Sequence, residues 1–553
     1  MKKSNLLKKA VSVLLVASAL AGCGSSASQT ATTAAPAAAG TETSEAATEA
    51  ASSESSAEPG TITMAMVSAW DSIIPFDTTS SYSDAVLDLI YDKLVYLKQD
   101  GTYEPRLADK WSMSDDNKVL TVHLNENAKW QDGEPVTADD VVFTMQVYNS
   151  PSAAVVRQNN VSPFAGFKEG DDSLQVKAVD EHTVEMTCAE PTNMDFLFFI
   201  KFRDIYILPK HLLGDTPYAD IRNNSYWEKP IGSGPCIYES QISGERMEFK
   251  ANKDYYLKTP QWDRFVVKVV ATPSLLSGLM NDEIDILAGN VASLQLSDWD
   301  MAQQQNLTCV STESVGYQYM AINTEKDYLP PKVRQAIDMA INRDAIVSGL
   351  LKGEGEPAFG PFATSHKYYD DVVNVGYNPE KAKELLAEAG WDGSHELVFS
   401  VPTGNSIREQ AAVIIQQNLQ EIGIKTKIES ADFATHLTKV REGNYDLGLI
   451  GSGGSPDPSE CVINFKPDHI NNFSHLSDWT IYNTGAEGEH AFNFEDRKVN
   501  YDNYQELLVE QVPFCFLYFQ NNLFAYNNRI GNVKDNQDYS QLNRDVWNWT
   551  IEK

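Results

Sequence analysis

The cysteines and histidines are the side chains of this sequence best suited to bind a metal or attack a substrate, yet their spacing fits neither use. The six cysteines include no CxxC pair, and the nine histidines form no cluster. Zinc and redox sites need thiolates or imidazoles at short, regular spacings. The sequence therefore predicts no metal site and no cofactor. It also predicts buried free thiols beyond Cys23, with one disulfide as the alternative for an exported protein.

Motifs of the common hydrolases are missing as well. The sequence has no G-x-S-x-G, no H-E-x-x-H, and no S-x-x-K followed by K-T-G, the patterns that place a nucleophile or an activated water. The nearest match, Gly451-Ser452-Gly453, lacks the register of a nucleophile elbow. We therefore expect no enzyme. A tethered glycoside hydrolase is a distant alternative, because its two carboxylates need not be adjacent in sequence.

A loop of small residues from Gly451 to Pro458 is a candidate ligand-binding segment. It directly follows a predicted strand, Tyr445 to Ile450, and ligands of open α/β sheets collect beyond the carboxyl ends of the strands. Small residues let a ligand approach the backbone and its N–H groups. The residues in question are Gly451, Ser452, Gly453 and Gly454. A plain flexible surface loop is the alternative.

Cysteine chemistry of another kind is predicted near the start of the chain. Lysines precede an apolar segment from Ala10 to Leu20, which is typical of a secretory signal and too short to span a bilayer. The segment ends in Leu20-Ala21-Gly22-Cys23, which resembles the lipobox of bacterial lipoproteins. We expect residues 1–22 to be a lipoprotein signal peptide and Cys23 to be acylated, with palmitate among its lipids. An ordinary cleaved signal peptide is the alternative.

Residues 23–60 have the composition of a tether. They are almost entirely Ser, Thr, Ala, Glu, Gly and Pro, without an aromatic residue. Such a segment buries too little apolar surface to offset the entropy lost on ordering. We expect a lipidated, disordered tether with a span on the order of 30–36 Å. It would hold a globular body at the extracytoplasmic face of the cell membrane.

The elements that must position any site follow Gly60. Roughly 490 residues remain there, too many for one hydrophobic core, so two or more lobes are expected. The net charge of −33 excludes nucleic-acid binding, because no basic stripe is present to neutralise phosphates. No second apolar run is long enough to span a membrane.

Local patterns predict a mixed α/β body. The alternating residues 61–67 predict a first strand, and residues 111–124 a hairpin with its turn at 115–117. Thr137 is the predicted N-cap of the helix that follows a second turn at Gln131 to Gly133.

The C-terminal half alternates helices with strands. Asn378 caps a predicted helix that ends at Gly390, and a second helix ends at Gly423. Strands at residues 424–428 and 445–450 follow. Helices that alternate with strands favour an α/β sheet with parallel strands.

Five segments, taken together and in chain order, resemble a known family. They are EPRLADKWSMSDDNKVLTVHLNENAKWQDGEPVTADDVVFT (104–144), PIGSGPCIYES (230–240), PPKVRQAIDMAINRDAIVSGLLKGEGEPAFGP (330–361), YNPEKAKELLAEAGW (377–391) and LLVEQVPFCFLYF (507–519). They are similar to the extracytoplasmic solute-binding proteins of family 5, the peptide and oligopeptide receptors of ABC importers. The resemblance covers most of residues 61 to 530.

The resemblance implies an α/β fold of the two-lobed periplasmic-binding-protein type, class II. The protein would be large, with an additional subdomain in lobe I. Lobe I would comprise residues 61–312 and a return segment, residues 516–553, with lobe II at residues 313–515 between them. Hinge strands are expected near Ser311 to Met320 and near Pro513 to Phe519.

The resemblance also implies a function. The chain would be a membrane-tethered receptor that captures a small ligand between its lobes and delivers it to an ABC permease with separate ATPase subunits. Peptide is the first ligand class, because the family is richest in peptide receptors. An oligosaccharide is the close alternative.

Residues expected at the ligand are carried over from the family one by one. Trp70 and Asp71 follow the first strand in a region that lines the cleft of relatives, although Trp70 could instead be a core residue. The loop from Pro361 to Asp370 also faces that cleft in relatives. It offers three polar side chains, Thr364, Ser365 and His366.

The loop after the second-lobe strand departs from the family pattern. In peptide-binding relatives an aspartate there pairs with the α-ammonium of the peptide, since a buried cation needs a buried anion. Gly454 takes this place here. Asp457 could serve if the loop is shifted, and a structural turn carboxylate is the alternative reading of Asp457.

Other matching residues are expected to be structural. Trp111, Trp130 and Trp391 are predicted core aromatics. Arg334 and Asp338 are four apart on a predicted helix, which favours an ion pair between them. Gly232 and Gly234 are predicted to form a turn.

Overall fold

The structure is a computed structural model that describes residues 60–97, 103–198, 202–455, 457–533 and 545–552. The predicted signal peptide and Cys23 lie outside the described residues, as does the tether up to residue 59. In the part of the chain that is described, no helix is long and apolar enough to cross a membrane.

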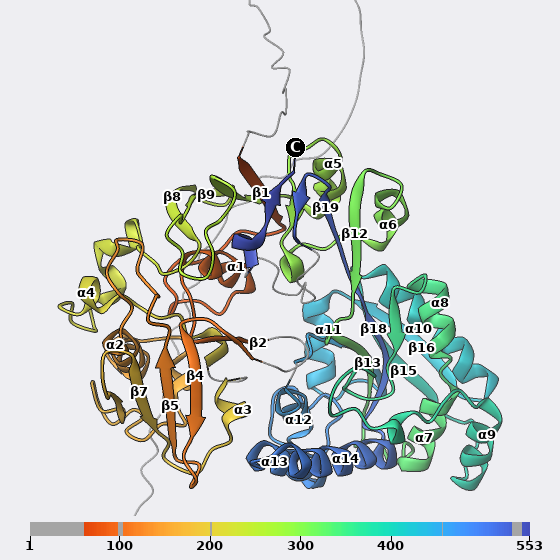
Figure 1. The fold of residues 1–553 in the computed structure, drawn as a ribbon. Helices are drawn as coiled ribbons and strands as arrows, with labels where there is room; N and C mark the ends of the chain where they lie inside the picture. Colours follow the sequence, from red (N-terminus) through yellow and green to blue (C-terminus); the bar gives the residue numbers. More distant parts are fainter. Residues whose placement is uncertain (1–59, 98–102, 199–201, 456, 534–544, 553) are drawn as a thin grey trace, which may run out of the picture. The chain divides into compact units, whose positions relative to one another are not determined.

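A seven-stranded mixed sheet is built from three distant parts of the chain (Figure 1). Strand β1 pairs in parallel with both of its neighbours, and the remaining pairs are antiparallel. In spatial order the strands are β12 (Leu307–Thr312), β19 (Asn522–Asn527), β11 (Ile286–Leu287), β1 (Thr61–Met66), β10 (Arg264–Val269), β9 (Arg246–Ala251) and β8 (Cys236–Ile242).

A smaller antiparallel sheet is built from residues that come after β1 and before β8 in the chain. Its strands are β4 (Ala108–Met113), β5 (Val119–Leu124), β7 (Thr183–Thr187) and β6 (Val176–Ala178). Helix α2 (Ala138–Asn149) packs on β6 and β7. Two short strands, β2 (Val95–Leu97) and β3 (Tyr103–Pro105), pair beside it.

A six-stranded mixed sheet occupies the C-terminal half. In spatial order the strands are β14 (Gly355–Pro357), β18 (Phe514–Gln520), β13 (Tyr317–Ile322), β17 (Leu447–Ser452), β15 (Glu396–Pro402) and β16 (Lys425–Ala431). Strand β15 runs parallel to both β16 and β17, as helices alternating with strands predict. The carboxyl ends of these three strands therefore share one edge of the sheet.

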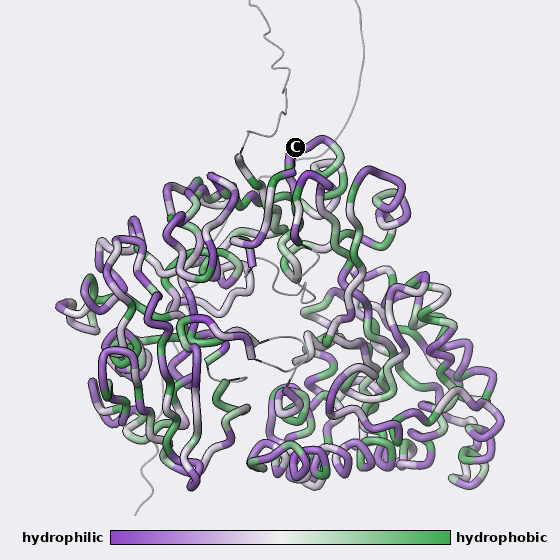
Figure 2. The backbone as a smooth tube through the Cα atoms, in the orientation of Figure 1, coloured by the Kyte–Doolittle hydropathy of each residue, from purple (hydrophilic) through white to green (hydrophobic). Residues whose placement is uncertain are grey.

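Helices cover both faces of the six-stranded sheet (Figure 1). One face packs against α7 (Pro331–Ala340), α8 (Arg343–Leu350), α9 (Pro379–Glu388) and α10 (Ser406–Glu421). The other face packs against α11 (Phe433–Arg441), α12 (Ser459–Val462), α13 (Thr480–His490) and α14 (Phe494–Gln511). Along α13 and α14 hydrophilic and hydrophobic residues alternate, as surface helices require (Figure 2).

The chain passes between the two large sheets twice. Residues 313–316 connect β12 to β13, and Asn521 alone connects β18 to β19. The predicted lobe boundaries stay predictions. By sheet membership, β18 continues beyond the predicted boundary at residue 515 and ends at Gln520.

The remaining helices and short strands complete the fold. They are α1 (Ser81–Ile90), α3 (Met194–Phe196), α4 (Lys210–Leu213), α5 (Leu275–Met280), α6 (Leu296–Ala302), β20 (Ile530–Gly531) and β21 (Thr550–Ile551).

Local predictions based on caps and turns are confirmed. Thr137 precedes α2, and the backbone N–H of Thr137 donates a hydrogen bond to the carboxylate of Asp140 at 2.8 Å. The side chain of Asn378 caps α9. Gly390 and Gly423 have the left-handed φ values of +73° and +89° that end a helix.

The predicted ion pair between Arg334 and Asp338 is wrong. Arg334 is buried and donates to the backbone carbonyls of Leu329 and Gln511, both at 2.7 Å. Asp338 pairs instead with Arg343. A spacing of four residues allows a pair but does not choose between competing partners.

The three tryptophans that were predicted to lie in the core differ in burial. Trp130 lies in the core, whereas Trp111 and Trp391 are half-buried at its margin. Gly232 approaches the chain so closely that an added Cβ would lie 1.7 Å from the carbonyl oxygen of Ile90. The five cysteines of the described ranges are free, and all but the half-buried Cys309 are buried, as predicted.

Candidate ligand-binding site

The loop after β17 is held against the first crossing between the sheets. Gly454 has a φ of +66°, and a Cβ there would lie 1.7 Å from the carbonyl oxygen of Val315. A side chain here would meet the backbone of the crossing, so this position requires a glycine. Gly453 differs, because a Cβ added to it would meet nothing within 4 Å.

An arginine covers the start of the same loop. Arg408 lies in the first turn of α10, and its Nε donates to Oε1 of Gln318 on β13 at 3.0 Å. A Cβ on Gly451 would lie 3.0 Å from a guanidinium nitrogen of Arg408. Burial lowers the pKa of the Arg408 guanidinium. Within the described ranges it makes no ion pair with a carboxylate.

The end of the loop carries a paired charge. Asp457 is buried, and one carboxylate oxygen lies 2.9 Å from a guanidinium nitrogen of the equally buried Arg497. Its other oxygen accepts hydrogen bonds from the backbone N–H and the hydroxyl of Ser459 at 3.0 and 2.5 Å. These contacts favour the structural interpretation of Asp457. Its assignment to the ligand stays a prediction.

The polar side chains of the loop from residue 361 to residue 370 have partners within the protein. The Thr364 hydroxyl donates to Glu356 at 2.7 Å, and the Ser365 hydroxyl donates to Glu313 at 2.6 Å. The ring of His366 stacks on Phe362. Since Glu313 belongs to the crossing segment 313–316, that segment contacts both this loop and Gly454.

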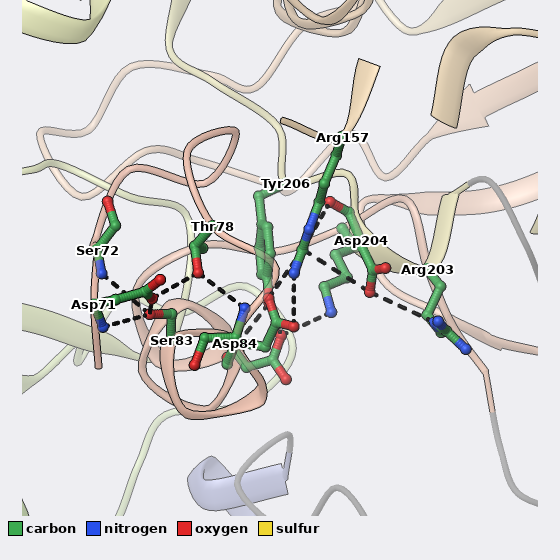
Figure 3. Close-up of polar contacts among 12 residues, drawn as sticks. Asp71, Ser72, Thr78, Ser83, Asp84, Arg157, Arg203, Asp204 and Tyr206 are labelled. Carbon is green, nitrogen blue, oxygen red and sulfur yellow. Dashed lines mark hydrogen bonds and ion pairs between the residues drawn. The ribbon is translucent and has the colours of Figure 1, made fainter. Parts of the chain in front are cut away.

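Trp70 and Asp71 lie in a separate group after β1. The indole Nε1 of Trp70, which is half-buried, donates to Gln241 on β8 at 2.7 Å. Asp71 accepts hydrogen bonds from the hydroxyls of Thr78 and Ser83 (Figure 3). Partial desolvation raises the pKa of the Asp71 carboxyl, but these hydrogen bonds outweigh it and hold that pKa below its usual value. The carboxylate organises its own loop.

A chain of ion pairs lies beside Asp71 (Figure 3). Arg157 donates to both carboxylate oxygens of Asp84, at 3.0 and 2.9 Å, and lies 4.0 Å from Asp204. Arg203 lies 3.5 Å from Asp204 and 3.6 Å from Glu460 on α12. The last ion pair therefore connects a segment before the first crossing with a segment between the crossings.

Sequence reasoning missed Arg408, Gln318 and this chain of ion pairs. The partners are far apart in sequence, so no spacing reveals them. Arg408 had one usable signal, because Asn405 is a strong N-cap that starts α10 at the strand edge. Among the described residues, no group of three His, Cys, Asp or Glu side chains could hold a metal ion.

Comparisons with known proteins place the chain in a family. The chain is 27% identical to the oligopeptide-binding protein AppA of Bacillus subtilis over 515 residues, which cover 85% of this chain and 89% of AppA. It is 27% identical to heme-binding protein A of Haemophilus influenzae, with 77% of this chain and 80% of that protein covered.

A solved structure has the same fold. The substrate-binding protein CtaP of Listeria monocytogenes superimposes with a TM-score of 0.79 at 24% identity, and the match covers 90% of this chain and all of CtaP. The family model of bacterial extracellular solute-binding proteins, family 5 middle, matches residues 102–472. That is more than half of the chain, which therefore belongs to the extracellular solute-binding proteins of family 5 and has their two-lobed α/β fold.

Proposed function

We propose that this protein is the receptor of an ABC importer and captures a peptide between its two lobes. One observation carries the proposal: the match to an oligopeptide-binding protein extends over 85% of this chain and 89% of the relative. Capture without turnover is in line with relatives that are named as binding proteins.

The mechanism follows from two lobes joined by two short connections. Ligand binds between them, bridges them, and shifts the open–closed equilibrium by its higher affinity for the closed form. Residues 313–316 and Asn521 are the segments in which the required backbone changes would concentrate. The closed form would then dock on a membrane permease whose ATPase subunits supply the energy.

An oligosaccharide is the second candidate ligand, and the loop after β17 supports it. Gly454 has no room for a side chain, and Asp457 is already paired with Arg497. The loop therefore offers no spare carboxylate for the α-ammonium of a peptide. Neutral sugars need no such partner.

Membrane attachment through Cys23 completes the proposal. An acylated Cys23 and the tether up to Gly60 would keep the receptor at the extracytoplasmic face, near its permease. Replacement of Cys23 by Ser should release the protein into the culture medium. Continued membrane retention of Cys23→Ser would count against the anchor.

A binding screen tests the ligand class. Purified protein is titrated with short peptides and with oligosaccharides of similar length, and binding is measured by calorimetry. We expect saturable binding of peptides, recovered intact by mass spectrometry. Binding of sugars alone would replace the first candidate by the second, and cleaved probes would overturn both in favour of an enzyme.

A further inference from the structure

Arg408 differs from the other arginines that the described parts of the chain bury. The following buried arginines each contact a carboxylate, as does the half-buried Arg529: Arg106, Arg157, Arg343 and Arg497. Arg334 has no carboxylate partner, but it donates to two backbone carbonyls. Arg408 has one neutral partner, Gln318. A half-buried guanidinium with spare donors is costly unless an anion meets it.

No described carboxylate forms an ion pair with Arg408, and the carboxylate of the adjacent Glu409 accepts instead from the backbone N–H of Gly404 at 2.8 Å. Two ionisable groups on the sheet, Tyr319 and Tyr518, interact with the charge of Arg408. Burial raises the pKa of Tyr518 to about 12 and raises that of Tyr319 further, so both hydroxyls stay neutral at physiological pH. The guanidinium is thus a local positive charge that the protein leaves uncompensated among the groups that the structure describes.

The position of Arg408 is suited to a ligand. Its guanidinium lies over Gly451, at the shared carboxyl edge of β15, β16 and β17, where α/β sheets bind ligands. Two residues further along, Gly453 borders open space. Arg408 itself is half-buried, so part of the residue remains accessible to a solute.

We propose that the Arg408 guanidinium binds a carboxylate of the ligand and thereby selects anionic solutes. The planar fork of an arginine matches a carboxylate with two parallel hydrogen bonds. The carboxylate could be the C-terminus or an acidic side chain of a peptide, or the uronic acid of a sugar. This inference rests on the proposed function as a solute receptor, but not on the ligand being a peptide.

The test compares matched probes that differ in charge. Tryptic peptides of casein are dimethylated at their amines, which keeps the positive charge. The digest is then divided, and in one half of it the carboxylates are converted to methylamides. Full-length purified protein is equilibrated with both halves, and bound peptides are quantified by mass spectrometry. We expect the free carboxylates to be preferred at least about tenfold, as a charge-assisted hydrogen bond would give.

Three variants separate ligand binding from structure. Arg408→Gln should reduce the preference to less than about threefold while the melting temperature stays the same or rises, because an uncompensated charge is removed. Arg408→Lys keeps the charge without the planar fork. Its preference for free carboxylates should lie between those of Arg408→Gln and the unaltered protein. The control Arg334→Gln should lower the melting temperature and leave the preference unchanged, because Arg334 bonds only to backbone.

A second pair of probes distinguishes the failure of this inference from the failure of the proposed function. If neither half of the casein digest binds, trigalacturonate and maltotriose replace it. Binding of trigalacturonate that Arg408→Gln abolishes would support the inference and overturn the peptide function. The inference itself is overturned by an equal affinity for charged and amidated probes, by a preference that survives Arg408→Gln, or by binding of no carboxylate probe at all.

Discussion

Two arginines border the two ends of one loop, and their surroundings are opposite. Arg497 at the far end is buried against Asp457, and both side chains are almost completely covered. Arg408 at the near end is half-buried, bonds to a neutral glutamine and lies over Gly451. The comparison separates charge that holds the loop in place from charge that is available to a ligand.

The chain of ion pairs in Figure 3 belongs to the first kind. Arg157 there meets the carboxylates of Asp84 and Asp204. Charges of this kind stabilise a packing arrangement and leave nothing for a solute. The charge of Arg408 is the exception, and it lies at the carboxyl edge of a sheet, where α/β proteins bind ligands.

The largest effect is expected from breaking the pair at the far end. Asp457→Asn leaves Arg497 buried without an anion, and loss of one partner of a buried pair costs about 3–5 kcal/mol of the free energy of unfolding. Urea denaturation measures it. The double variant Asp457→Asn/Arg497→Met should recover part of the loss, because the unpaired charge is gone. If Asp457→Asn keeps its stability but loses ligand binding, Asp457 contacts the ligand.

A buried histidine near Arg408 gives the next effect, which depends on pH. His436 is fully buried, and its Nδ1 lies 2.9 Å from the hydroxyl of Ser400. Burial, with a smaller contribution from the charge of Arg408, lowers the pKa of His436 from 6.5 to about 4. The folded protein therefore holds a neutral imidazole where the unfolded chain takes up a proton.

The sign follows from proton linkage. Between pH 6.5 and about 4 the unfolded chain binds a proton that the folded protein does not, so stability is complete above pH 6.5 and falls as the pH falls. Full linkage over that range is worth about 3 kcal/mol. In urea titrations at several pH values, His436→Gln should remove this part of the acid slope. An unchanged slope would mean that the imidazole takes up its proton as readily in the folded protein as in the unfolded chain.

A third prediction concerns the two neighbouring glycines of the loop. Gly454→Ala places a Cβ against the carbonyl of Val315 at a left-handed φ, which should cost about 1–3 kcal/mol. Gly453→Ala meets no atom and should be close to neutral in stability. We expect Gly453→Ala to weaken ligand binding by filling the open space. Equal stability losses in the two variants would contradict the difference between the positions.

Much of the fold could be predicted from sequence, since its signals are local. Thr137, Asn378, Gly390 and Gly423 mark the helix ends correctly because caps and left-handed stops depend on adjacent residues. The resemblance added the family and the two lobes, which local patterns could not supply.

The site could be predicted only in part, because its contacts join distant segments. The glycines of the loop after β17 and its place after a strand predict its role at the ligand, which stays a prediction. The contacts of Arg408 with Gln318 and of Asp457 with Arg497 depend on tertiary packing, which spacing does not reveal. The error over Arg334 and Asp338 has the same origin, since backbone carbonyls and Arg343 compete for these side chains.

The smallest effect on stability is expected at the ion pair between Arg203 and Glu460. Both side chains are about one-third exposed, at 34% and 37%, and solvent screens such pairs. Glu460→Gln should therefore change the free energy of unfolding by only about 0–1 kcal/mol.

The effect of Glu460→Gln should appear in the open–closed equilibrium instead, because this pair joins segments on either side of the first crossing. Small-angle scattering of the ligand-free protein should show a larger average radius of gyration for Glu460→Gln, and the difference should shrink when ligand is added, since the ligand then supplies the bridge. Asp502→Asn is the matched control, because Asp502 forms its comparable ion pair with Lys498 inside α14 and bridges no crossing. If both variants leave the radius unchanged, the Arg203–Glu460 pair belongs with the charges that only hold local structure.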